Sequence, residues 1–122
     1  MRLYLARHPD RITSKHPRII EDMLELCEHH QLAVNAMIGM LEDLSEFDLK
    51  TRYAKKLMDY PLWELKTRSR GGEKGGARIY FFVENNIAYI CNAEVKTGNE
   101  PSEHKLEEAL EILVAHRAGR KI

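Results

Sequence analysis

Two neighbouring stretches decide the fold of this chain: residues 62–68, which read LWELKTR, and residues 77–82, which read ARIYFF. Apolar and polar residues alternate in both, and this alternation predicts two half-buried β-strands. Between positions 66 and 78 there are five basic residues and one acidic residue. The basic residues are Lys66, Arg68, Arg70, Lys74 and Arg78. A sheet that buries one face and presents Lys and Arg on the other is suited to holding phosphate groups.

Composition limits the class of protein. The sequence has 122 residues, which predicts one domain over 1–122. Hydrophobic residues make up 43% and charged residues 31%, as in folded proteins of the cytosol. The formal net charge is zero, so binding to nucleic acid would need a local basic patch. No apolar run is long enough for a membrane span, and the N-terminus lacks the apolar core of a signal peptide.

The first half of the chain has mostly helical periodicity. Apolar residues recur with helical spacing over 18–29 and again over 32–44, which predicts a helical hairpin with its turn near 29–33. Pro17 precedes the first of these helices, in a position that proline tolerates well. Residues 2–6 predict a short strand before them.

One more helical turn is expected around Tyr53 and Leu57, ended by Pro61. After that proline the pattern alternates, with a second strand over 78–84 and a third over 87–93.

The connections between these elements are also visible in the sequence. Asn85 and Asn86 predict a tight turn, and the glycine-rich segment 71–76 predicts a flexible loop. Ser102 is the expected N-cap of a final helix that ends near Gly119. The order of elements predicts an α+β fold, with a small twisted antiparallel sheet of three to four strands, an N-terminal helical pair on one face and a C-terminal helix.

Alternation also predicts which side chains share a face. Trp63 and Leu65 should point away from Glu64 and Lys66, and we expect Trp63 in the core. In the next strand, alternation alone leaves open which face is buried under helices. Cys91 lies in an apolar strand and is expected to be a buried free thiol, because two cysteines are too few for a disulfide framework.

Four pieces of this sequence resemble the RelE superfamily of type II toxins, most closely its phage-derived HigB-like branch. They are LWELK at 62–66, RIYFF at 78–82, KTGNEP at 96–101 and, in the helix that follows, Ala109. The order and spacing of the four pieces agree with that family, and the two preceding helices fit it by pattern. Ala93 and Val95 stand where the family carries a phenylalanine and a lysine, and the glycine-rich loop is longer by residues 73–76.

The resemblance implies a ribosome-dependent mRNA endoribonuclease of a toxin–antitoxin system, acting in the cytoplasm and neutralised by a cognate helix-turn-helix antitoxin. Such enzymes use no metal or other cofactor. The ribose 2′-hydroxyl attacks the adjacent phosphate, which requires a base, cations for the developing charge and an acid for the leaving oxygen. The alternative function is a RelE-like module that binds RNA or protein without cleaving, which the zero net charge and the loss of a lysine at Val95 favour. A third reading is a partner-binding protein whose helices pair with another chain, and a homodimer also remains open.

By this resemblance Arg78 and Lys96 are the candidate catalytic residues. A planar guanidinium grips two phosphate oxygens at once, which suits Arg78 to a developing phosphorane. The structural alternative for Arg78 is a surface ion pair with Glu64 or Glu84, and for Lys96 it is a solvated loop position.

Four further cations are candidate RNA-binding residues. Lys66 and Arg68 alternate on one face of the strand at 62–68, while Arg70 and Lys74 lie in the basic loop. The alternative for all four is a charged face that only keeps the protein in solution.

His104 and Glu94 are the candidate acid and base. The alternatives are a capping or surface role for His104 and an ion pair with Lys96 for Glu94. No metal site is expected, because His29 and His30 are adjacent and no further ligand is spaced to complete one.

Overall fold

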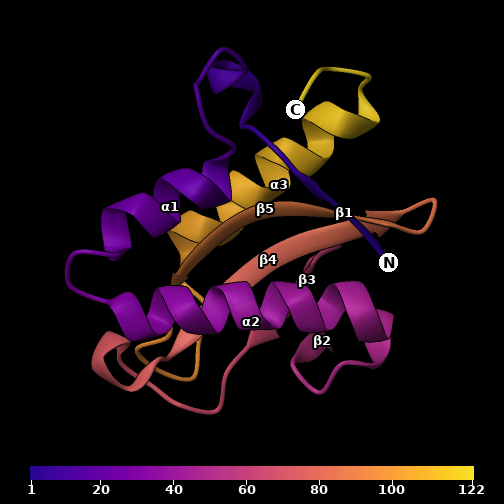
Figure 1. Cartoon of the computed structure of the whole chain (residues 1–122). Helices are drawn as coiled ribbons and strands as arrows, with labels where there is room; N and C mark the ends of the chain where they lie inside the picture. Colours follow the sequence, from indigo (N-terminus) through magenta and orange to yellow (C-terminus); the bar gives the residue numbers. More distant parts are fainter.

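A five-stranded mixed sheet forms the centre of the molecule, in the order β1-β5-β4-β3-β2 (Figure 1). The structure is a computed structural model that describes residues 1–122. The strands are β1 (Arg2–Leu5), β2 (Ala54–Lys56), β3 (Trp63–Lys66), β4 (Ala77–Glu84) and β5 (Ile87–Val95). The helices are α1 (Arg18–Leu26), α2 (Gln31–Phe47) and α3 (Glu103–Arg117), and the short 3-10 helices are η1 (Pro9–Arg11), η2 (Asp48–Lys50) and η3 (Gly72–Lys74).

The α+β prediction is confirmed, but the predicted antiparallel sheet of three to four strands is wrong in two respects. The sheet has five strands, and β1 pairs with β5 in parallel, with Arg2 opposite Ile87. The predicted helical turn after α2 is also wrong, because Ala54–Lys56 forms the edge strand β2, antiparallel to β3. Three residues are too few to show a period of two, and Tyr53 and Leu57 imitate helical spacing around them.

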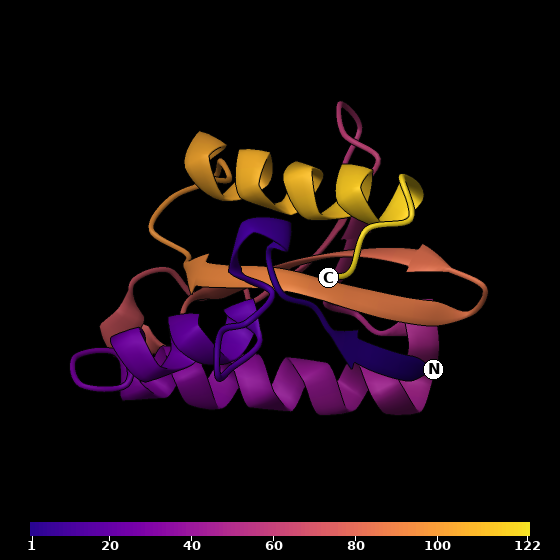
Figure 2. The same ribbon diagram turned by 90° about the horizontal axis from the view of Figure 1, so that it is seen from above.

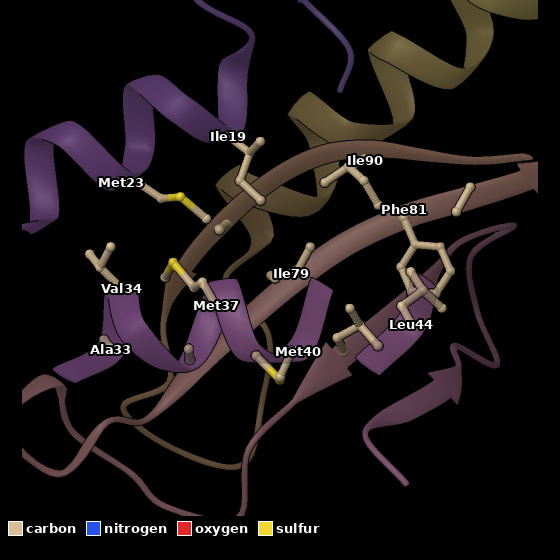
Figure 3. Packing of buried hydrophobic residues seen from close by; sticks show 14 residues of the cluster. Ile19, Met23, Ala33, Val34, Met37, Met40, Leu44, Ile79, Phe81 and Ile90 are labelled. Atoms are coloured by element: carbon tan, nitrogen blue, oxygen red, sulfur yellow. The ribbon is translucent and has the colours of Figure 1, made fainter. Parts of the chain in front are cut away.

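Helices cover both faces of the sheet. Figure 2 shows the sheet between α3 on one side and the pair α1 and α2 on the other. Figure 3 shows how Met37 and Leu44 of α2 and Ile19 of α1 pack against Ile79 and Phe81 of β4. A second cluster packs under α3, and its fully buried members on the sheet include Tyr80 and Cys91.

Alternation in β4 therefore divides its side chains between two cores. Ile79 and Phe81 belong to the α1–α2 side, and Tyr80 and Phe82 belong to the α3 side. Trp63 packs against the α1–α2 core as predicted, with its ring 6.3 Å from that of Phe81. The consequence for function is that the α3 face, which carries the cations of β3 and β4, is also covered.

The ends of the elements follow their local sequence. Pro17 is the residue before α1, and the Ser102 hydroxyl caps α3 by accepting a hydrogen bond from the Lys105 backbone N–H at 3.3 Å. Asn85 and Asn86 make the β4–β5 turn with φ values of 52° and 62°, which asparagine tolerates better than most residues. None of the helices combines the length and the apolar character that a membrane span requires.

A buried polar network joins α1, β5 and α3 at the edge of the sheet that β1 leaves uncovered. The Asp22 carboxylate accepts hydrogen bonds from the Ala93 backbone N–H at 2.9 Å and from Lys105 Nζ at 2.7 Å. Arg18 reaches Asp22 at 2.9 Å and Glu108 at 3.0 Å. The Asp22 carboxylate therefore pairs with the Ala93 N–H, which would otherwise be an unpaired donor at this edge of the sheet.

The Glu108 carboxylate has a perturbed pKa. Burial alone would raise the pKa of Glu108, but hydrogen bonds from Asn92 and Arg18, together with the charges of Arg18 and Lys105, outweigh burial and hold it below its usual value.

Candidate functional site

The candidate site lies where β3, β4 and β5 end beside the start of α3. Lys66 pairs with Arg78 across β3 and β4, and Arg78 pairs with Glu94 across β4 and β5. All three stand on the α3 face, because they follow the alternation of Tyr80. Lys96 comes directly after β5, so the register brings both candidate catalytic residues to one end of the sheet.

Arg78 is buried, with 1% of its side chain exposed, and all of its contacts are internal. Its Nη1 donates to Glu64 Oε2 at 2.9 Å, and its Nη2 donates to the Gly98 carbonyl at 2.8 Å. Glu64 is 2% exposed. The ion pair with Glu64 that the sequence offered as an alternative is therefore present, but it is a buried pair instead of a surface pair. The hydrogen bond from Arg78 to the Gly98 carbonyl holds the loop after β5 against the sheet.

Lys96 is also buried, and its Nζ donates to the Thr67 carbonyl at 2.5 Å and to the Arg68 carbonyl at 3.4 Å. The pKa of Lys96 is lowered from its ordinary value, first by burial and then by the charges of Arg78, Lys66 and Arg70, with Glu64 acting in the opposite direction. Four cations thus share this end of the sheet with the carboxylates of Glu64 and Glu94. Lys96 is therefore not the solvated loop lysine that the sequence left open as its structural alternative.

The glycine-rich loop is anchored to the same point. The Gly71 backbone N–H donates to the Lys96 carbonyl at 2.6 Å, and the Lys96 backbone N–H donates to the Gly76 carbonyl at 3.0 Å. Gly72 is buried against His30, so close that an added Cβ would lie 1.9 Å from His30 Nδ1. The segment predicted to be a flexible loop instead contains a 3-10 turn that packs against α2.

A cationic cleft of about 360 Å³ opens beside these buried residues. Its charged lining residues are Arg52, Lys66 and Arg68, and Tyr53, Thr67 and Ser69 complete the lining. The Arg52 guanidinium donates to the Tyr53 hydroxyl at 2.7 Å and lies 4.8 Å from the centre of its ring. We call this the cationic cleft. Its lining contains no carboxylate, so an anion bound there would meet no negative charge in the lining.

The sequence analysis missed Arg52 and Tyr53. They precede β2, whose strand character was not recognised, and pairing of β2 with β3 brings them beside Lys66. The signal that could have found them is the cluster of three cations at 52–56 next to an aromatic residue.

The two cations of the basic loop, Arg70 and Lys74, lie in different surroundings. Arg70 donates to Asn99 Oδ1, so it joins the basic loop to the loop after β5. Lys74 is exposed in η3, which packs against α2, and it lines neither the cationic cleft nor the buried cluster.

The two candidate acid–base residues, Glu94 and His104, differ in their hydrogen bonding and exposure. Glu94 accepts a hydrogen bond from the Tyr80 hydroxyl at 2.5 Å and from the Ser102 backbone N–H at 3.1 Å, and it forms no ion pair with Lys96. Burial raises the pKa of Tyr80, and its hydrogen bond to Glu94 raises it further. His104 is exposed in the first turn of α3, and its side chain makes no hydrogen bond or ion pair within the chain. Glu94 is therefore part of the scaffold, and His104 is accessible.

Comparison with known proteins gives no family for this chain. A scan against protein-family models found no match, and a search of curated proteins found no similar sequence.

Proposed function

We propose that this chain is a RelE-like endoribonuclease that holds single-stranded mRNA in the cationic cleft and cleaves it by attack of a ribose 2′-hydroxyl. The observation that carries the proposal is the gathering of Lys66, Arg70, Arg78 and Lys96 at one end of the sheet, where burial and then the charges of the other three cations lower the pKa of Lys96. A protein with zero net charge has no general field to hold RNA, so a local excess of cations is the feature that RNA binding requires.

In this proposal the cations divide into two groups by their exposure. Lys66 and Arg68, with Arg52, contact phosphate oxygens directly, since they line the open cleft. Arg78 and Lys96 lie behind them with their hydrogen bonds made, and their fixed positive charge would stabilise the negative charge that develops on the phosphorane. His104 is the accessible group available for proton transfer.

The proposal includes the partners that the resemblance implies. The mRNA would be bound on the ribosome in the cytoplasm, and a helix-turn-helix antitoxin would hold the toxin inactive. Both partners follow from the sequence resemblance.

A second candidate function is a module of the same fold that binds RNA without cleaving it. The observation that favours it is the burial of Arg78 and Lys96, whose donors are already taken by Glu64 and by backbone carbonyls. A cation in that state contributes a field but forms no direct bond to a phosphate unless its internal partners move.

The experiment is induction of the wild-type chain in a bacterial host, with mapping of mRNA 3′ ends and a cleavage assay on purified ribosomes programmed with mRNA. We expect growth arrest and cleavage for the wild type, and at least about tenfold slower cleavage for Lys66→Ala. The matched control is Lys15→Ala, because Lys15 is an exposed lysine outside the lining of the cationic cleft.

Two results would contradict the proposal. RNA bound without cleavage would leave the binding module as the function. Absence of both binding and cleavage would contradict both candidates.

A further inference from the structure

The strand β1 lies at an edge of the sheet, and its outer side has no partner. The Ala6 backbone N–H donates to the Ile90 carbonyl at 3.0 Å, so alternation along the strand turns the backbone groups of Leu3 and Leu5 away from β5. Because β1 pairs with no strand other than β5, these outward N–H and C=O groups are left without a strand partner.

Other exposed parts of the sheet edge are protected against pairing. At the opposite edge, β2 has only three residues, and two of them are the exposed lysines Lys55 and Lys56. Beyond β1, the Ala93 backbone N–H of β5 is bound by the Asp22 carboxylate. Short edges and charged edge residues prevent unwanted strand pairing. The strand β1 carries its one charge, Arg2, at its first residue, so it is the edge to which another strand can add.

An apolar groove of about 480 Å³ lies beside this open edge, between β1, α1 and α2. Figure 2 shows β1 at the edge of the sheet, next to α2. The apolar lining residues are Leu3, Ile20, Met23, Ile38 and Leu41, and Glu42 and Ser45 complete the lining. Ile38 is 45% exposed, although its side chain is large and apolar. Since side chains alternate along a strand, a strand added to β1 would direct every second side chain toward this groove.

Charge decides which occupant fits. Residues 19–49, which include most of α1 and all of α2, contain eight acidic residues and no Lys or Arg. Glu42 in the lining is exposed and belongs to none of the ion pairs of the chain. RNA would be repelled from this face. A second copy paired through β1 would set another acidic α1–α2 layer beside the first, whereas a basic segment would be attracted.

We propose that the open edge of β1 is a docking site for a basic protein segment, which adds to the sheet as a strand, directs alternate apolar side chains into the groove and sets a lysine or arginine beside Glu42. In this mode of recognition, main-chain hydrogen bonds give affinity and the groove selects the side chains. The site lies at the opposite edge of the sheet from the cationic cleft, so it does not depend on the proposed function.

The test measures binding of the full chain to fluorescein-labelled nonapeptides by fluorescence anisotropy at low salt. The probe has three valines that alternate with two threonines, between a pair of lysines at each end. One comparison peptide has glutamates in place of the lysines, and another has serines in place of the valines. We expect the probe to bind at least about tenfold more tightly than either comparison peptide.

Two variants locate the bound probe. Ile38→Lys should weaken its binding at least about tenfold, because the change removes an apolar surface of the groove and adds a like charge. Glu42→Lys should reduce the preference for lysine ends over glutamate ends at least about threefold. The matched controls are Leu32→Lys, at an exposed leucine of α2 outside the lining, and Glu107→Lys on α3, and both should bind the probe as the wild type does.

Backbone methylation tests whether the probe binds as a strand. Two further peptides are N-methylated, one at the valines and the other at the threonines. In a strand only one of these two sets of N–H groups faces β1, so one peptide should lose at least about tenfold in affinity and the other should not.

Each of the other outcomes overturns the proposal. Equal binding of the lysine and glutamate peptides, binding of no peptide, or unchanged binding in Ile38→Lys would remove the docking site. Equal effects of the two methylations would remove strand addition. A wild-type dimer in sedimentation velocity that is lost in Ile38→Lys would assign this edge to a second copy of the chain.

Discussion

Replacement of Arg78 by methionine should destabilise the fold strongly, because it leaves a buried carboxylate without its partner. The Glu64 side chain is 2% exposed and Arg78 Nη1 lies 2.9 Å from its Oε2. Removing one partner of a buried ion pair costs about 3–5 kcal/mol. The change also removes the donor to the Gly98 carbonyl, which is part of that cost.

The measurement is urea unfolding followed by circular dichroism, with a double-mutant cycle. If the slope is about 2 kcal/mol per molar urea, a loss of about 4 kcal/mol lowers the midpoint by about 2 M. In the cycle, Arg78→Met combined with Glu64→Gln should regain about half or more of the loss, because the second change removes the unpaired charge. Glu84→Gln is the matched control for a carboxylate at the sheet, since Glu84 pairs with His116 and Arg117 at the surface and should change stability by less than about 1 kcal/mol.

The reasoning is refuted if Arg78→Met costs less than about 1 kcal/mol, or if the double variant is no more stable than the single one. Either result would mean that Glu64 reaches water or another donor once Arg78 is gone. A large loss in Arg78→Met that is largely restored in the double variant would instead show that the charge balance of the pair, beyond its packing, holds the end of the sheet together.

Three further predictions concern stability. The pKa of Glu108 is held below its usual value of 4.5, so its contribution to stability is present above that pH and is lost as the pH falls below it. Between pH 7 and pH 3 the thermal midpoint should therefore fall less in Glu108→Gln than in the wild type. An equal fall in the two proteins would contradict this. Gly72→Ala should cost about 1–3 kcal/mol because the new Cβ meets His30 Nδ1 at 1.9 Å, and His30→Ala in the same chain should restore most of it in urea unfolding. Ser102→Ala should cost about 1 kcal/mol through loss of the α3 cap, measured by the thermal midpoint, and an unchanged midpoint would show that the cap contributes little.

Local sequence pattern was sufficient for elements that show their own period. Alternation in 62–68 and 77–82 gave β3 and β4, and helical spacing gave α1 and α2 within a few residues of their ends. The pairing of β1 could not be obtained in this way, because a strand of four residues contains no information about its partner. The edge strand β2 was not recognised because it has only three residues and because the apolar residues at its ends imitate helical spacing.

The candidate site was predicted in position but not in burial. Alternation placed Lys66 and Arg68 on one face of a strand, and the structure brings Lys66 into register with Arg78. Alternation could not show that α3 covers that face, or that Arg78 and Lys96 are buried. Arg52 enters the site only through the pairing of β2, a long-range contact that no local pattern carries.

The parallel pairing of β1 with β5 has a consequence for how the chain is made. Arg2–Leu5 can join the sheet only after residues 87–90 have left the ribosome, because those residues are its sole strand partner. Until then α1 and α2 have no complete sheet to cover, and the apolar faces that later pack on β4 and β5 stay in water. The chain therefore spends most of its synthesis in a form that aggregates or is degraded easily, and the cleft residues come together only near its end.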